Sequence, residues 1–184
     1  MVAFKLDAKK KRYANWSELT YYCRYSANPV GRFFIDLLYL EKKKKITEEK
    51  KIYQASDNLC TALQIINHIQ DCKEDFEKLD RIYLPTEYFK KYSVKTQNLK
   101  NNFSTKEFNK MKLEIILNVE KLLENLKDDL KLIDIWQLKK ETLIILNIAK
   151  RLSFLLKIND PLEKKVKLSR IDLIFCFIKG IIWD

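Results

Sequence analysis

The chain has 184 residues, of which 47% are hydrophobic, and it contains only two glycines and three prolines. This length is enough for one domain with a substantial core, and the low glycine and proline content excludes collagen-like, disordered and turn-rich β proteins. Four cysteines without a C-x-x-C pair exclude the common zinc and redox motifs. Because the polar start shows no signal-peptide pattern and the thiols fit a reducing compartment, a cytoplasmic location is expected.

The formal net charge is +11, from 36 Lys and Arg against 25 Asp and Glu. Such a surface favours a negatively charged partner, and nucleic acid, anionic lipid and diphosphate are the three candidates. The basic residues are scattered and lack the interleaved aromatic residues of single-strand binders. No nucleic-acid partner is therefore predicted.

The first forty residues predict helix around one interruption. Residues 1–15 are polar and basic, with no clear apolar period. A helix is expected to begin near Ser17, with Ser17 or Asn15 as its cap. Pro29 predicts a kink or a break, because proline inside a helix removes a backbone hydrogen bond and clashes with the preceding turn. Helix is then expected to continue to the charged run at residues 41–45.

The rest of the chain also reads as helix, with no strand signal, so the predicted fold class is all-α. Thr47 is expected to cap a helix that stops at Asp80, and a short helix follows near residues 86–92. Ser104 and Glu107 form a capping box that opens a long helix with an apolar stripe to Leu130.

Two further helices complete the predicted bundle. Residues 134–157 are apolar on most sides, which is typical of a central helix. The last helix, residues 171–183, is expected to be capped by Ser169. It is too short to cross a bilayer, so it is expected either to pack on the bundle or to rest at a membrane surface, where Lys179 would reach the headgroups.

A row of polar side chains is the most informative feature of the sequence. At about 100° per residue, one helix face carries Gln64, Asn67, Asp71 and Asp75. Oxygen ligands of this kind suit Mg2+, which completes its coordination with water and phosphate. A solvated helix end is the alternative interpretation of the spacing alone. Arg81 follows the row, and its guanidinium can hold phosphate oxygens, so the combination favours a diphosphate substrate.

Three other side chains near the row have simpler interpretations. His68 is expected to be packed or to face solvent, because Mg2+ prefers oxygen. Cys23 and Cys72 are expected to be small apolar fillers of the core.

Three stretches of the chain resemble the squalene and phytoene synthase family: residues 21–32, 62–75 and 81–85. The motif Ser-Ala-Asn-Pro-Val-Gly-Arg at residues 26–32 is most similar to the bacterial hopanoid-pathway branch of the family, the hydroxysqualene and squalene synthases. Weaker similarity extends over nearly the whole chain. The resemblance implies an isoprenoid synthase-type helical bundle over residues 1–184 as one domain, with prenyl chains in a cavity capped by Mg2+ and diphosphate.

The resemblance also implies roles for individual residues. Asp71 and Asp75 match the family's second aspartate-rich motif, with Asn67 as a further Mg2+ ligand. Tyr22 matches a tyrosine that handles the carbocation or a proton, and Arg81 matches a diphosphate contact. The expected activity is prenyl transfer from farnesyl or presqualene diphosphate, with no NADPH site assigned. Four side chains are expected to line the substrate cavity: Gln64, Tyr25, Val30 and Phe34.

One departure from the family pattern affects this expectation. The family has two aspartate-rich motifs on facing helices, and this chain has only the second, so it resembles the C-terminal two-thirds of the family. It is interpreted as part of a longer or split enzyme, as a noncatalytic binding or assembly protein, or as a truncated product; the first is favoured. The expected partners are accordingly an N-terminal-half protein or a second copy, with a peripheral contact at the inner membrane also compatible with the sequence.

Overall fold

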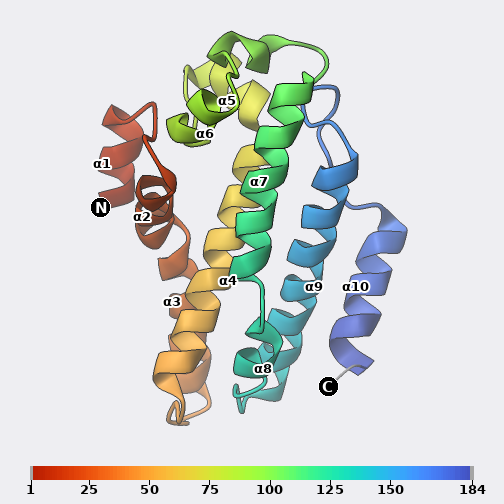
Figure 1. Cartoon of the computed structure of the whole chain (residues 1–184). Helices are drawn as coiled ribbons and strands as arrows, with labels where there is room; N and C mark the ends of the chain where they lie inside the picture. Colours follow the sequence, from red (N-terminus) through yellow and green to blue (C-terminus); the bar gives the residue numbers. More distant parts are fainter. Residues whose placement is uncertain (1, 183–184) are drawn as a thin grey trace.

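The structure, a computed structural model, describes residues 2–182. The described residues form helices and contain no strand, which confirms the all-α prediction; one isolated bridge joins Arg12 to Ile82. In chain order (Figure 1) the elements are α1 Val2–Lys9, α2 Trp16–Ser26, α3 Asn28–Glu41, α4 Glu49–Gln70, α5 Cys72–Leu79, α6 Thr86–Lys91, the 3-10 helix η1 Thr96–Lys100, α7 Lys106–Leu122, α8 Leu126–Leu130, α9 Trp136–Ile158 and α10 Arg170–Ile182.

The break predicted at Pro29 separates α2 from α3. Asn15 caps α2, and its Oδ1 accepts a hydrogen bond from the Glu18 amide at 2.9 Å. Pro29 lies in the first turn of α3, where a missing N–H leaves no helical hydrogen bond unmade. Gly31 follows, and a Cβ there would lie 2.4 Å from Ser56 Oγ. The glycine therefore allows α3 to pack closely on α4.

The helix predicted from Thr47 to Asp80 is two helices with Asp71 between them. The amide of Asp71 still donates to the Asn67 carbonyl, and the amide of Asp75 to the Asp71 carbonyl at 2.8 Å. The helical path thus continues across the joint and keeps the polar row together. Thr47 is not the cap: Glu48 holds that position, and no side chain there accepts an amide hydrogen bond.

Two predictions in the following segment were also wrong. Thr105 caps α7, whereas the Ser104 amide and hydroxyl donate to Asp160. The expected helix to Leu130 is interrupted because Asn125 adopts a left-handed conformation with φ 58°, which asparagine tolerates better than most residues. The apolar stripe continues, but in the separate helix α8.

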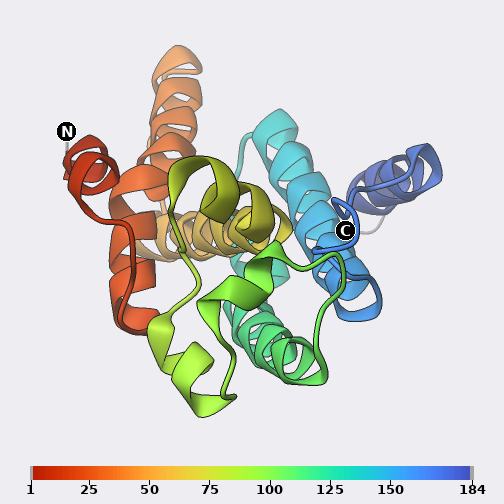
Figure 2. The ribbon, with the colours of Figure 1, turned by 90° about the horizontal axis from the view of Figure 1, so that it is seen from above.

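The bundle is organised around α4, which packs against α2, α3, α7, α8 and α9. Figure 2 shows α4 near the middle of the bundle and α10 at its margin, where α10 packs on α9. The expected central position of α9 is confirmed, since it packs against α4, α7, α8 and α10. Ser169 caps α10 as predicted, accepting from the Asp172 amide at 3.1 Å. Among residues 2–182, no helix combines the length and apolar character needed to cross a membrane.

Candidate functional site

Two irregular segments pair and bring the start of the chain to the end of α5. The amide of Ile82 donates to the Lys11 carbonyl at 2.9 Å, and the amide of Thr86 donates to the Tyr13 carbonyl at 2.8 Å. The carboxylate of Asp80 accepts hydrogen bonds from the side chains of Lys11 and Arg12. This pairing fixes the C-terminal end of α1 beside residues 81–83.

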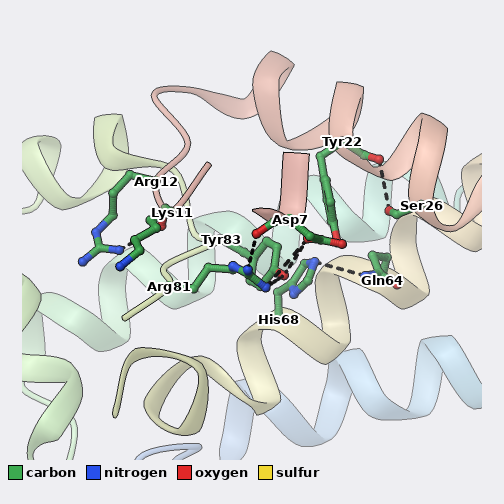
Figure 3. A network of polar contacts seen from close by, with 9 residues as sticks. All are labelled: Asp7, Lys11, Arg12, Tyr22, Ser26, Gln64, His68, Arg81 and Tyr83. Carbon is green, nitrogen blue, oxygen red and sulfur yellow. Dashed lines mark hydrogen bonds and ion pairs between the residues drawn. The ribbon is translucent and has the colours of Figure 1, made fainter. Parts of the chain in front are cut away.

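A buried polar cluster forms where these segments meet α2 and α4 (Figure 3). Asp7 Oδ1 accepts hydrogen bonds from the phenol of Tyr22 at 3.0 Å and from that of Tyr83 at 3.3 Å. Arg81 donates to the Tyr83 phenol oxygen at 3.0 Å, and its other terminal nitrogen donates to the Asp7 carbonyl. Arg81 Nε is buried without a hydrogen-bond partner. One donor of the guanidinium is therefore left unpaired.

An aromatic layer lies under this cluster. His68 stacks on Tyr83 with ring centroids 3.6 Å apart and an interplanar angle of 14°. Tyr22 and Tyr13 pack against the Tyr83 ring at 5.3 and 5.5 Å. Burial, with a smaller contribution from the nearby Arg81 charge, lowers the pKa of His68 to about 3, so the imidazole is neutral at physiological pH. Of the two positions expected for His68, packed or facing solvent, the structure shows the packed one.

The two amide side chains of the predicted row, Gln64 and Asn67, differ in exposure. Gln64 is half-buried, and its amide nitrogen lies 3.2 Å from His68 Nε2, which orients the amide. Asn67 is exposed. Tyr22 is buried, and burial together with its contact to Tyr83 raises the pKa of its phenol well above the ordinary range. Tyr22 is thus held as a neutral hydroxyl group.

The two carboxylates of the polar row, Asp71 and Asp75, form its acidic end, called here the acidic row. Two cations, Arg81 and Lys165, lie near it. Burial, followed by the neighbouring Asp71 carboxylate, raises the pKa of Asp75 to about 6, while Arg81 and Lys165 act in the opposite direction. Lys165 Nζ lies 2.5 Å from Asp71 Oδ1. The loop that carries Lys165 is attached to α4 by a hydrogen bond from the side-chain amide (Nε2) of Gln70 to the Val166 carbonyl. The two carboxylates are thus close enough to repel each other, and a lysine partly offsets that repulsion.

The donor set of the row consists only of oxygen. Asp71 and Asp75 supply carboxylates and Asn67 an amide, and these groups fit Mg2+, which proteins commonly hold through one or two carboxylates plus substrate phosphate. Within residues 2–182, no group of three or more His, Cys, Asp and Glu side chains is arranged to hold a metal. Further coordination would therefore have to come from a ligand or from another segment.

The apolar side chains predicted to line a cavity lie on exposed faces. Val30 and Phe34 are exposed on α3, and Tyr25 is exposed on α2, where its ring packs edge-on against Tyr21 at 5.0 Å. Cys23 and Cys72 are buried thiols, as expected. Of the aromatic residues assigned roles from the sequence, only Tyr22 lies in the buried polar cluster.

Three residues of the site were not assigned from the sequence. Asp7 reaches Tyr22 only through the pairing of residues 11–13 with residues 82–86, which has no periodic sequence signal. Tyr83 belongs to the resemblance motif, but its stacking on His68 depends on tertiary structure. Lys165 lies in the loop before α10, and its basic run gave no indication of a specific partner.

Comparisons with known proteins identify the family and the fold of the chain. The family model described as squalene/phytoene synthase matches residues 1–172. The chain is 34% identical over 174 residues to a hydroxysqualene synthase from Sinorhizobium fredii, covering 95% of this chain and 57% of that protein. It superposes on a dehydrosqualene synthase with a TM-score of 0.83 at 20% identity, covering 97% of this chain and 61% of the other.

A squalene synthase structure from Alicyclobacillus acidocaldarius superposes with a TM-score of 0.62 at 26% identity, covering 83% of this chain and 57% of the other. The helical bundle therefore has the isoprenoid synthase fold. With the family match over most of its length, the chain belongs to the squalene/phytoene synthase family. It spans 57% of the length of the hydroxysqualene synthase that it matches.

Proposed function

We propose that the chain contributes one half of a prenyl diphosphate site and acts in squalene/phytoene synthase-type prenyl transfer on farnesyl or presqualene diphosphate. The arrangement of Asp71 and Asp75 beside Arg81 carries this proposal. Two close carboxylates, of which Asp75 has a raised pKa, favour a cation, and a guanidinium with an unpaired buried donor favours a phosphate oxygen. Together they suit a diphosphate that arrives with a metal ion.

Asp71, Asp75 and Asn67 would hold Mg2+, which supplies charge neutralisation for the departing diphosphate. Arg81 would bind and orient the same group through its free Nε–H, since its terminal nitrogens are already fixed by Tyr83 and Asp7. Lys165 offsets part of the carboxylate repulsion at Asp71. These residues together would stabilise negative charge as it develops on the leaving group.

Tyr22 and Gln64 would act on the prenyl side of the site. The phenol of Tyr22 is neutral and donates to Asp7, so its oxygen lone pairs and aromatic ring would stabilise a developing cation without carrying a formal charge. Gln64 is oriented by His68, which leaves its amide oxygen available as a further dipole. Tyr25, Val30 and Phe34 would add apolar wall once another segment covers their exposed faces.

A partner segment is part of the proposal. The chain spans 61% of the dehydrosqualene synthase on which it superposes, and α3 exposes an apolar surface that includes Val30, Phe33, Phe34, Leu37 and Leu40. Exposed apolar patches of this kind are typical of interaction surfaces. A helical N-terminal-half protein or a second copy of the chain would cover α3 and supply the acidic residues that the row lacks.

A noncatalytic relative is the second candidate function. The ion pair between Lys165 and Asp71 favours it, because an ammonium of the chain already lies against one carboxylate of the row. In that case the family fold would serve as a binding or assembly module, and α3 would be its contact surface.

Mg2+-dependent release of pyrophosphate from farnesyl and presqualene diphosphates tests the proposal. The chain is assayed alone and together with any co-purifying protein, beside Asp71→Ala and Asp75→Ala. Loss of release in both variants, with circular dichroism unchanged, supports the enzyme. Wild-type turnover in both variants would refute the site, and no release in either setting would favour the binding module.

A further inference from the structure

The marginal helix α10 exposes apolar side chains on most of its circumference. Phe175 is 69% exposed and Ile171 is 78% exposed, whereas Cys176 and Gly180 are its buried positions. Gly180 sets the packing, since a Cβ there would lie 2.4 Å from Ile144 of α9. The helix therefore packs on α9 through one face and leaves the rest of its circumference exposed. Five other large apolar residues on it are also exposed: Leu173, Ile174, Phe177, Ile178 and Ile182.

A groove of about 460 Å³ between α9 and α10 combines these apolar side chains with cations. Ile171, Phe175 and Lys179 follow each other at four-residue spacing and lie on one side of α10. Lys150 of α9 lines the same groove. Burial, followed by the charges of Lys179 and Lys127, lowers the pKa of Lys150. The cations are thus close enough to repel each other.

The one carboxylate lining the groove is already engaged. Asp172 Oδ1 accepts from Arg151 Nε at 2.7 Å, and Asp172 Oδ2 accepts from the amide and hydroxyl of Ser169 at 2.9 and 2.7 Å. In the part of the chain that the structure describes, Lys150 and Lys179 have no carboxylate partner. The groove therefore presents two unneutralised ammonium groups among exposed aromatic and aliphatic side chains.

We propose that the α9–α10 groove docks on the surface of an anionic phospholipid membrane, with Lys150 and Lys179 on lipid phosphates and the exposed side chains of α10 in the upper acyl region. The 13 residues of α10 rise about 20 Å, less than the roughly 30 Å of a bilayer core, so the helix would lie along the surface. This inference goes beyond the proposed function and does not depend on it.

Charge favours lipid over a second copy of the chain as the covering surface. If α10 packed against another α10, Lys179 would be buried beside apolar side chains, and the helix would offer only Asp172, which is already paired. Burying an unpaired ammonium is costly. At a lipid surface the lysine stems lie along the apolar region while their ammonium groups reach phosphate. The same residues therefore suit a bilayer and do not suit a symmetric protein interface.

Vesicle flotation tests the proposal with the whole chain, using phosphatidylcholine vesicles and equimolar phosphatidylcholine–phosphatidylglycerol vesicles. Binding is expected only to the anionic vesicles. Lys150→Gln and Lys179→Gln should each weaken it about fivefold, because one lysine near such a surface is worth about 1 kcal/mol. Phe175→Ser should also weaken it. Lys110→Gln, on an exposed face of α7, is the matched control and should bind as wild type.

Three results would overturn the docking surface. One is equal binding to neutral and anionic vesicles, or no binding to either. Another is an equal loss with Lys110→Gln, which would indicate diffuse attraction by the +11 charge rather than a groove. The third is a dimer in light scattering that Phe175→Ser converts to monomer, since a second copy would then cover α10. None of these readouts involves turnover, so the prenyl transfer proposal is tested separately.

Discussion

We expect the charged carboxylate of Asp75 to destabilise the folded chain. The substitution Asp75→Asn should remove that destabilisation. Burial and the adjacent Asp71 carboxylate raise the pKa of Asp75 from 3.8 to about 6. That difference corresponds to about 3 kcal/mol for a fully buried group, and solvent screening of this half-buried side chain reduces it to about 1 kcal/mol. Asparagine keeps the shape without the charge. At pH 7 we expect the variant to be more stable, with Tm higher by roughly 2–4 °C for a chain of this length.

The sign of the pH dependence gives a second readout of the same substitution. Because the folded-state pKa of Asp75 is raised, its favourable contribution is complete below pH 3.8 and is lost as the pH rises through about 6. The stability difference between wild type and Asp75→Asn should therefore be largest at pH 7 and shrink towards pH 4. Thermal unfolding by circular dichroism at both pH values measures it.

Glu77→Gln is the control for this experiment, since Glu77 is an exposed acid on the same helix. It should leave the stability unchanged at both pH values. A lower Tm for Asp75→Asn at pH 7, or a difference that does not change with pH, would refute the idea that the row is electrostatically strained.

Four further substitutions test other contacts. Lys165→Ala should tighten Mg2+ binding by up to about fivefold in calorimetry. The ion pair with Asp71 that it removes is partly exposed and worth at most about 1 kcal/mol. Unchanged affinity would mean that Lys165 does not compete with Mg2+ for Asp71. Gly180→Ala should destabilise the chain by about 1–3 kcal/mol in urea unfolding, because the added Cβ meets backbone atoms of α9 at 2.8 and 2.9 Å. Gly31→Ala should cost less, because the nearest atoms belong to side chains that can rotate; an equal cost would contradict this. Tyr22→Phe should cost about 1 kcal/mol of stability and slow pyrophosphate release without changing Mg2+ affinity; weaker Mg2+ binding would place the phenol at the metal instead.

The helices could be predicted where an apolar period or a strong local signal exists. Pro29 marks the break between α2 and α3, and the spacing of the polar row survives the joint at Asp71 because helical hydrogen bonds continue through it. The interruption at Asn125 was missed because the apolar stripe continues beyond it. Periodicity indicates which face is buried, whereas one left-handed residue can divide a helix without changing that pattern.

The polar cluster could be predicted only in part. Tyr22 was identified by resemblance and Arg81 first by its place after the polar row. Asp7, which joins them, comes from the opposite end of a pairing between irregular segments. Backbone hydrogen bonds between such segments leave no repeating pattern in the side chains. For the same reason, the contact between Lys165 and Asp71 depends on how a loop returns to α4.

Calorimetric binding of a non-hydrolysable farnesyl diphosphate analogue, with and without Mg2+, tests the central claim most directly because it does not require turnover. The proposed site predicts binding that depends on Mg2+, is lost in Asp71→Asn and is retained in Glu77→Gln. Binding that is independent of Mg2+ and unaffected by Asp71→Asn would contradict a cation-assisted diphosphate site in the acidic row.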